Sequence, residues 1–318
     1  MMKKEVTSLL ARNPLVSGLM TQLTRLDRTG ANQLRIFTYH RLGEPAVFEA
    51  QMRYLAQNYY VASMHELMQV HAGGHTLPPR AVMVTFDDAY QDFAEVAWPT
   101  MQRYSMPAAV FVATGFPDQP GRVFWWDRLE AAATQTERRD ELSTPVGNLP
   151  LAVPSQRLNA YKKLRDYVKM LPHEVAMAYV NQFCEELGNP SVVNDVLGWD
   201  ELRRLAREGV TFGAHTQTHP LMNRIPVGEA VAEAVSSQQD LAREIGSVLP
   251  IFAYPNGSFS QEVVDGLRAE GFEMAFTTGP GANQLPHTDW LRLRRNNISP
   301  KSNLTMLQAR LLQSATIL

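Results

Sequence analysis

Short runs of apolar residues recur along the chain, and stretches with a helical repeat separate most of them. The runs that read as buried strands lie at 34–39, 81–86, 108–114, 210–214, 250–255 and 273–278. The helical stretches lie at 90–105, 199–208, 227–246 and 260–270. Gly209 and Gly271 follow two of them, as expected where a helix ends in a left-handed residue. This alternation predicts an α/β fold with a mainly parallel sheet and helices outside it, either a barrel or a doubly wound sheet.

Residues 117–198 depart from this alternation. They include a polar loop, STPVGNLPLAVPSQ, and a charged stretch of helical character that runs from Arg157 to Leu187. We therefore predict a mostly helical insertion on the rim of the sheet domain. The chain would then consist of an N-terminal helical segment at 1–33 and a domain at 34–318 that carries the insertion at about 117–198.

Composition narrows the class of protein. The chain has 318 residues, 45% of them apolar, and a net charge of −2, which gives no electrostatic reason to expect nucleic-acid binding. Cys184 is the only cysteine, so an internal disulfide and a cysteine-rich metal site are both excluded. No stretch approaches the roughly 20 apolar residues of a membrane-spanning helix.

The first thirty residues are not typical of a signal peptide, because Arg12 and Pro14 interrupt their apolar run. We expect a protein that is cytoplasmic or peripheral to the membrane. Its N-terminal segment would either pack on its own domain, which we favour, or lie on a membrane surface. The sequence does not indicate an oligomeric state.

Two carboxylates and two histidines stand directly after predicted strands. Asp87 and Asp88 end the run AVMVTFDD, and His215 and His219 follow the run VTFGA. Reactive groups of parallel α/β folds gather where strands end. Two imidazoles four residues apart can face one ion, as helical histidine pairs do, and with one carboxylate they form a three-ligand set with open positions.

In this interpretation Asp88 is the third ligand, and Asp87 is free to take a proton from bound water. Two simpler alternatives exist. Asp88 could cap the helix that begins near Tyr90, and each histidine could be merely hydrogen-bonded.

Two further positions suggest roles in hydrolysis. The turn Pro255-Asn256-Gly257 follows a predicted strand, and its backbone N–H groups could hold an oxyanion, although it could equally be a simple tight turn. His40 also follows a strand and could protonate an amine leaving group, unless it is a core histidine. Aromatic residues that could stack on sugar rings are Tyr39, Trp125, Trp126, Tyr254 and Trp290. For Tyr39 and Tyr254 we favour a place in the core.

These residues together resemble the polysaccharide deacetylase family, the family 4 carbohydrate esterases that share the NodB homology domain. The motif T-F-D-D-G appears as Thr85–Ala89, H-[ST]-x-x-H-P as His215–Pro220, and F-A-Y-P-N/Y-G as Phe252–Gly257. The opening YHR, the run FWWDRL, and the strand AFTT followed by RLRRNNIS resemble a bacterial subfamily associated with exopolysaccharide synthesis. The resemblance covers about residues 34–300.

The resemblance implies a distorted (β/α)7 barrel that binds one divalent metal ion, commonly zinc. It implies that Asp88, His215 and His219 are the ligands, that Asp87 is the base, and that the Asn256 backbone N–H is the oxyanion donor. Zn²⁺ is the expected ion, and Co²⁺ or Ni²⁺ would suit the same ligands.

The sequence departs from the family pattern at three places. Ala89 replaces the usual glycine, and Ala253 stands where many members have an arginine that pairs with the base. Arg295, or its neighbour Arg294, could take over that pairing. The late L-x-H motif that supplies the general acid is absent, but poly-N-acetylglucosamine deacetylases that begin with Tyr-His take this acid from the early position, which favours His40.

The expected function is metal-dependent hydrolysis of an acetyl group, N-acetyl rather than O-acetyl, on a polysaccharide or lipid-linked sugar of exopolysaccharide metabolism. The alternatives are a carbohydrate-binding pseudoenzyme, which Ala89 and Ala253 would favour, and a deacylase of a small acylated sugar.

Overall fold

The computed structural model describes residues 14–27 and 29–315 and contains seven parallel strands arranged as a barrel. The strands are β1 (Gln33–Tyr39), β3 (Ala81–Asp87), β4 (Ala109–Val112), β7 (Thr211–Ala214), β8 (Ile251–Ala253), β9 (Met274–Phe276) and β11 (Arg295–Asn297). Each pairs with the next in this order, except for β9 and β11: β9 has a single parallel bridge, between Phe276 and Leu293, to the segment that leads into β11. Because β11 pairs with β1, the sheet curls round to its start. The predicted distorted (β/α)7 barrel is confirmed.

Two short strands extend this sheet. β2 (Tyr60–Val61) runs parallel to β3, and β10 (Asn283–Gln284) runs antiparallel to β1, so the sheet as a whole is mixed. Helices surround the barrel: α3 (Pro45–Asn58), α4 (Met64–His71), η1 (Phe93–Ala97), α5 (Trp98–Arg103), α9 (Trp199–Arg207), α10 (Val227–Ile245), α11 (Gln261–Ala269) and α12 (Leu304–Ala315). Single 3-10 turns lie at η2 (Pro255–Gly257) and η3 (Trp290–Arg292).

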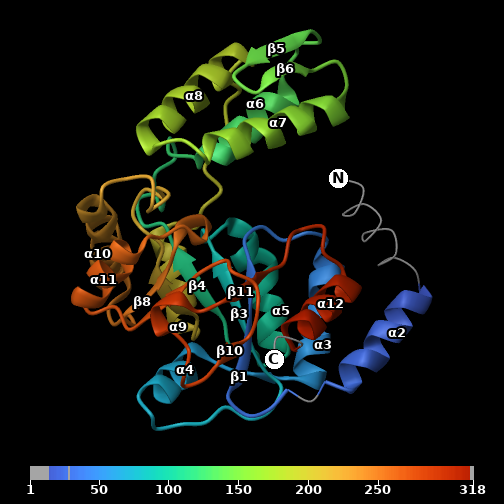
Figure 1. The fold of residues 1–318 in the computed structure, drawn as a ribbon, viewed down its shortest axis with the longest axis vertical. Coiled ribbons are helices and arrows are strands. Elements are labelled where there is room, and N and C mark those ends of the chain that lie inside the picture. Colours follow the sequence, from blue (N-terminus) through green and yellow to red (C-terminus); the bar gives the residue numbers. More distant parts are fainter. Residues whose placement is uncertain (1–13, 28, 316–318) are drawn as a thin grey trace.

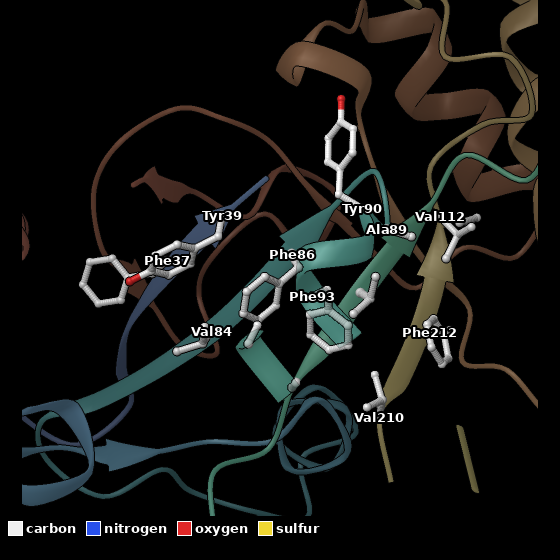
Figure 2. Packing of buried hydrophobic residues seen from close by; sticks show 14 of the residues in the cluster. Phe37, Tyr39, Val84, Phe86, Ala89, Tyr90, Phe93, Val112, Val210 and Phe212 are labelled. Atoms are coloured by element: carbon white, nitrogen blue, oxygen red, sulfur yellow. The ribbon is translucent and has the colours of Figure 1, made fainter. Parts of the chain in front are cut away.

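Alternation along the strands divides the core into two layers. On β3, Ala81 and Met83 belong to a cluster inside the barrel, whereas Val82, Val84 and Phe86 belong to the cluster between sheet and helices. Figure 2 shows Val84 and Phe86 in this outer cluster beside Phe37 and Tyr39 of β1. The same alternation decides which residues at the strand ends face the barrel interior.

The insertion forms a separate body beyond the carboxyl ends of the strands (Figure 1). It consists of α6 (Trp125–Gln135), the antiparallel hairpin β5 (Glu141–Thr144) and β6 (Gly147–Pro150), α7 (Pro154–Val168) and α8 (His173–Glu186). The prediction of a polar loop at 143–156 is wrong over the hairpin. Leu142 and Leu149 face each other across the hairpin and are buried in the insertion's own core. Two apolar residues in an otherwise polar stretch were too weak a pattern to predict the two strands.

The N-terminal helix α2 (Pro14–Arg25) lies beside α12 (Figure 1), where Gln308 Nε2 donates to Thr21 Oγ1 at 3.0 Å. Residues 1–13 of the predicted segment lie outside the described residues. No described helix has the length and apolar character to cross a membrane. The division at residue 33 stays a prediction.

Candidate active site

Polar residues at the carboxyl ends of four strands, β1, β3, β7 and β8, meet at one end of the barrel, and Arg295 at the start of β11 reaches them from inside it. Asp87 ends β3 on the inward side of the alternation, two residues after Thr85, and His215 continues the inward side of β7. Arg295 pairs with Ile36 in the register of β1 and β11 and is likewise directed inward. The strand register therefore places these charged and polar groups inside the barrel.

Asp88, His215 and His219 form a set that could hold a metal ion. One potential ligand atom of each lies within 4.8 Å of the others. Asp88 Oδ1 is 3.6 Å from His215 Nε2 and 3.4 Å from His219 Nε2. All three side chains are buried, yet Asp88 Oδ1, His215 Nε2 and His219 Nδ1 have no hydrogen-bond partner. Buried polar atoms without partners cost free energy, so this set fits a cation that would bind Asp88 Oδ1, His215 Nε2 and the His219 Nε2 that faces the same carboxylate oxygen.

The pKa directions agree with a cation site. Burial and the charge of Asp87 raise the pKa of Asp88 well above its ordinary value. Burial lowers the pKa of His215 to about 4 and lowers that of His219 well below its usual range. Neutral imidazoles keep a lone pair for a metal, and a cation would favour the charged form of Asp88.

The two histidines reach each other through an irregular loop. They follow β7, as predicted, and although their spacing resembles that of helical pairs, residues 215–220 are not helical and Thr216 and His219 have φ of 65° and 60°. Thr216 Oγ1 accepts a hydrogen bond from the His219 N–H at 3.0 Å and thereby closes the loop. The rings still face each other, with centroids 4.8 Å apart.

Neighbouring groups orient both rings. His215 Nδ1 lies 2.6 Å from the Ala253 carbonyl oxygen, so Nδ1 donates and Nε2 is left to face Asp88. His219 packs edge-on against Trp126 and Phe124 of the insertion, with centroids 4.6 and 5.5 Å away. Position 253 thus contributes through its backbone, whichever side chain it carries.

Asp87 is held by Arg295 in a bidentate ion pair. Both oxygen–nitrogen distances are 2.7 Å, and both side chains are almost completely buried. Burial alone would raise the pKa of Asp87, but Arg295, His215 and His40 together hold it below its ordinary value. Arg294, the other predicted partner, instead reaches the Pro280 carbonyl at the surface.

His40 lies at the mouth of the site with 36% of its side chain exposed, and its Nε2 is 3.7 Å from Asp87 Oδ2. Burial of the ring lowers the pKa of His40, and the charge of Asp87 opposes this effect. Asn256 lies in the turn η2 with φ of 55°, and its Oδ1 accepts a hydrogen bond from Lys169 Nζ at 2.6 Å.

A cavity of about 310 Å³ joins these groups to the insertion. Its lining from the barrel side includes His40, Arg41, Asp88, Tyr90, His219, Leu221, Asn256 and Pro300. Its lining from the insertion consists of Trp125, Trp126, Asp127, Glu130, Tyr161, Arg165 and Lys169. The insertion therefore forms one wall of the site.

Of the five aromatic residues predicted to contact sugar, the structure brings only Trp125 and Trp126 to this cavity. Tyr39 and Tyr254 fall on the outward side of their strands, and their hydroxyls donate to Gln51 Oε1 and the Leu291 carbonyl. Trp290 is not part of the cavity lining and packs against His71 of α4, so nothing in the structure supports its predicted contact with substrate.

The sequence analysis missed a polar network that ties the insertion to the barrel. Tyr90 Oη donates to Asp127 Oδ2 and accepts from Trp126 Nε1, both at 2.9 Å. Arg41 lies over the Tyr90 ring at 3.8 Å and donates to Asp127 and Asp195. The sequence offered one indication of this network: Arg41 directly follows His40, and Tyr90 lies two residues after Asp88.

A buried His-His-Asp set beside a carboxylate–arginine pair, at the carboxyl end of a parallel barrel, is typical of hydrolases that use a metal ion. Comparison with known proteins agrees with this class. Residues 74–275 match the family described as polysaccharide deacetylase, and the chain belongs to that family. The family is in general metal-dependent.

Related proteins and structures extend the comparison. The chain is 35% identical to a poly-β-1,6-N-acetyl-D-glucosamine N-deacetylase of Escherichia coli over 71 residues, which cover 22% of this chain but only 11% of that relative. Its fold is similar to that of the Streptococcus pyogenes deacetylase PplD, with a TM-score of 0.58 and 19% identity over 89% of this chain and 98% of the other. IcaB from Ammonifex degensii gives the same TM-score and identity, over 89% and 99% of the two chains.

Proposed function

We propose that the chain hydrolyses an acetyl group, N-acetyl rather than O-acetyl, on a polysaccharide or lipid-linked sugar of exopolysaccharide metabolism. The observation that carries this proposal is the buried Asp88, His215 and His219 set, with unpartnered ligand atoms, beside the Asp87–Arg295 pair. The N-deacetylase activity of the Escherichia coli relative and the cavity lined by Trp125 and Trp126 support an N-acetylated sugar as substrate.

In this proposal Asp88, His215 and His219 would hold one divalent ion, Zn²⁺ first and Co²⁺ or Ni²⁺ as alternatives. When bound, such an ion supplies Lewis acidity and lowers the pKa of a water molecule. The chain's own residues would do the rest.

Asp87 would take the proton of the attacking water, and Arg295 keeps this carboxylate ionised and fixed in orientation. The Asn256 backbone N–H would donate to the acetyl oxygen as negative charge develops there. As the bond from the acyl carbon to nitrogen breaks, His40 would give a proton to the departing amine. The products are acetate and a free amino sugar.

The departures from the family pattern leave these groups in place. Arg295 provides the guanidinium that many members carry at position 253, and the Ala253 carbonyl holds His215. For this reason we favour the enzyme over a carbohydrate-binding pseudoenzyme.

Acetate release tests the proposal. N-acetylated chito-oligosaccharides, β-1,6-linked N-acetylglucosamine oligomers and O-acetylated sugars would be incubated with the chain, with Zn²⁺ and with a chelator. We expect release from an N-acetylated oligomer that needs the metal and that Asp87→Asn abolishes. Full turnover of Asp87→Asn would overturn the base assignment. Binding without release under every condition would favour the pseudoenzyme, and release from O-acetylated sugar alone would overturn the N-acetyl preference.

A further inference from the structure

The insertion touches the candidate oxyanion turn through one side chain. Lys169 directly follows α7, and its Nζ donates to Asn256 Oδ1 at 2.6 Å across 87 residues of sequence. Both residues line the same cavity as His40, Asp88 and His219. A residue of the insertion thus lies within the candidate site itself.

Contacts on both sides of Lys169 fix the position of the end of α7. Two residues that precede Lys169 in α7, Leu164 and Val168, are buried in the insertion's core. The Lys169 N–H donates to the Arg165 carbonyl and closes the helix. A few residues later the His173 N–H donates to the Arg224 carbonyl of the barrel at 3.2 Å, so this corner is also fastened to the loop after His219.

The turn that Lys169 contacts has an uncommon backbone. Asn256 and Gly257 have φ of 55° and 68°, a region that L side chains rarely adopt. Thr278 Oγ1 donates to the Asn256 carbonyl at 3.2 Å, and a Cβ on Gly257 would lie 2.1 Å from that hydroxyl. Asn256 is therefore held at its backbone by the barrel and at its side chain by the insertion.

We propose that Lys169 is a positioning residue, which fixes the Asn256 turn so that its backbone N–H is aimed at the acetyl oxygen. The inference rests on the proposed function. It gives the insertion a part in the reaction beyond forming a wall, because closure of the insertion over the barrel completes the oxyanion side of the site.

The surroundings of the ammonium group support this assignment. In the described parts of the chain no carboxylate lies within ion-pair distance of Lys169, so the neutral Asn256 amide is its partner. Burial and the nearby Arg165 lower the pKa of Lys169, and its charge in turn acts on His40. A half-buried cation that is bound to one neutral amide suits a role in holding that amide.

A set of four variants tests the proposal. Lys169→Met removes the donor, Lys169→Gln keeps a donor without the charge, and Asn256→Gly removes the acceptor while tolerating the positive φ. Lys163→Met is the matched control, because it makes the same change at an exposed position of α7.

With metal and an N-acetylated oligosaccharide, we expect Lys169→Met to lower kcat about tenfold with little change in KM, less than the loss of a direct oxyanion donor. Lys169→Gln should recover much of this loss. The double variant with Asn256→Gly should lose no more than the worse single variant, because both changes break one contact. The proposal would be overturned if the losses of kcat in the two single variants multiplied in the double variant. It would also be overturned if Lys169→Met changed only KM, or if Lys163→Met lost as much kcat as Lys169→Met.

Hydrogen exchange gives a readout that does not need turnover. In the metal-free chain, Lys169→Met should speed exchange of the amides at 256–259, and Lys163→Met should not. Unchanged exchange there would overturn the proposal even if kcat fell. If the wild-type chain released no acetate from any substrate, the proposed function would fail and the catalytic part of the inference with it, whereas the exchange result would still decide whether Lys169 holds the turn.

Discussion

The barrel and the insertion are stabilised in different ways. The barrel has apolar layers on both sides of its sheet and buries complete ion pairs, Arg295 with Asp87 and Arg35 with Asp27. The insertion has one small core shared by three helices and a hairpin. It meets the barrel through Trp126, Asp127 and Lys169 around the cavity. The reactive groups therefore lie on the barrel, which has the larger core, and the wall that would select the substrate lies on the insertion.

The largest effect should come from Asp88→Asn. This change removes a ligand of the candidate metal set, so Zn²⁺ binding and acetate release should fall to the level of the metal-free protein. Stability of the metal-free chain at neutral pH should rise by about 1–3 kcal/mol, because burial and the charge of Asp87 disfavour the ionised carboxylate at this position and an amide carries no charge. Calorimetric Zn²⁺ titration and urea unfolding in chelator measure the two effects.

Asp166→Asn, an exposed carboxylate of the insertion, is the control and should change neither quantity. If Asp88→Asn bound Zn²⁺ with wild-type affinity, the metal site would not lie at Asp88 in the barrel. The contrast between a barrel with the reactive groups and an insertion that forms the substrate wall would then fail.

The next effect concerns the buried pair. Arg295→Met leaves the Asp87 carboxylate buried without its partner and should cost about 3–5 kcal/mol of unfolding free energy at pH 7. In the wild type the folded-state pKa of Asp87 lies below its ordinary value, so the charged group stabilises the fold above about pH 4 and this contribution fades as pH falls. Between pH 8 and 4.5 the wild-type contribution is constant, but in Arg295→Met burial acts on Asp87 without the opposing guanidinium and raises its pKa. The variant therefore takes up a proton in this range, and the cost of Arg295→Met should shrink towards acid pH.

Urea unfolding from pH 4.5 to 8 measures this dependence, with Arg294→Met at the exposed neighbouring position as control. Adding Asp87→Asn to Arg295→Met should restore part of the loss, since the unpaired charge is removed. A cost that is independent of pH would mean that the pair does not govern the stability of the barrel.

The two regions also differ in how far the sequence predicts them. Apolar runs bounded by helices located all six of the predicted barrel strands, and Asp87, Asp88 and the two histidines were expected at their ends because strand ends carry reactive groups. Whether a residue points into the barrel or towards the helices could be decided only from the register of the strands. Tyr39 and Tyr254 occupy outward positions, whereas Arg295 faces inward on a strand of three residues that no apolar run marks.

The insertion was recognised as helical, and Trp125 and Trp126 within it were predicted to contact sugar, but the contact of Lys169 with the Asn256 turn could not be foreseen. Lys169 follows a charged helix whose exposed face carries Lys162 and Lys163, and nothing local distinguishes the three. What separates them is the angle at which α7 lies over the barrel, and that is set by contacts between residues far apart in the sequence.

A smaller effect should appear in local opening. Because the insertion has the smaller core, its amides in α7 and α8 should exchange through an opening whose free energy is at least about 2 kcal/mol below that of β1 and β3. Native-state hydrogen exchange at rising urea measures both values. Trp126→Phe, which keeps the ring but loses the bond to Tyr90, should lower only the value for the insertion. Identical opening free energies would show that barrel and insertion are one cooperative unit.

The smallest effect is expected at the junction of the two regions. Ala89 has φ of 51°, and its carbonyl accepts from the Leu197 N–H at 2.9 Å, where the chain returns from the insertion. Ala89→Gly should relieve about 1 kcal/mol of left-handed strain. It also loses a buried methyl group, worth about 0.8 kcal/mol, and adds freedom to the unfolded chain. These terms nearly cancel, so unfolding free energy should change by less than about 1 kcal/mol.

Turnover should change little as well, because the Ala89 side chain carries no reactive group and the Asp88 backbone already has positive φ. Acetate release by Ala89→Gly, compared with wild type at equal metal loading, decides the matter. A rise of a hundredfold, about 2.7 kcal/mol of transition-state stabilisation, would show that alanine distorts the turn after the aspartates. In that case the barrel, although intact in its ligands, would be the impaired region, and the binding-protein alternative would describe the natural chain better than the enzyme does.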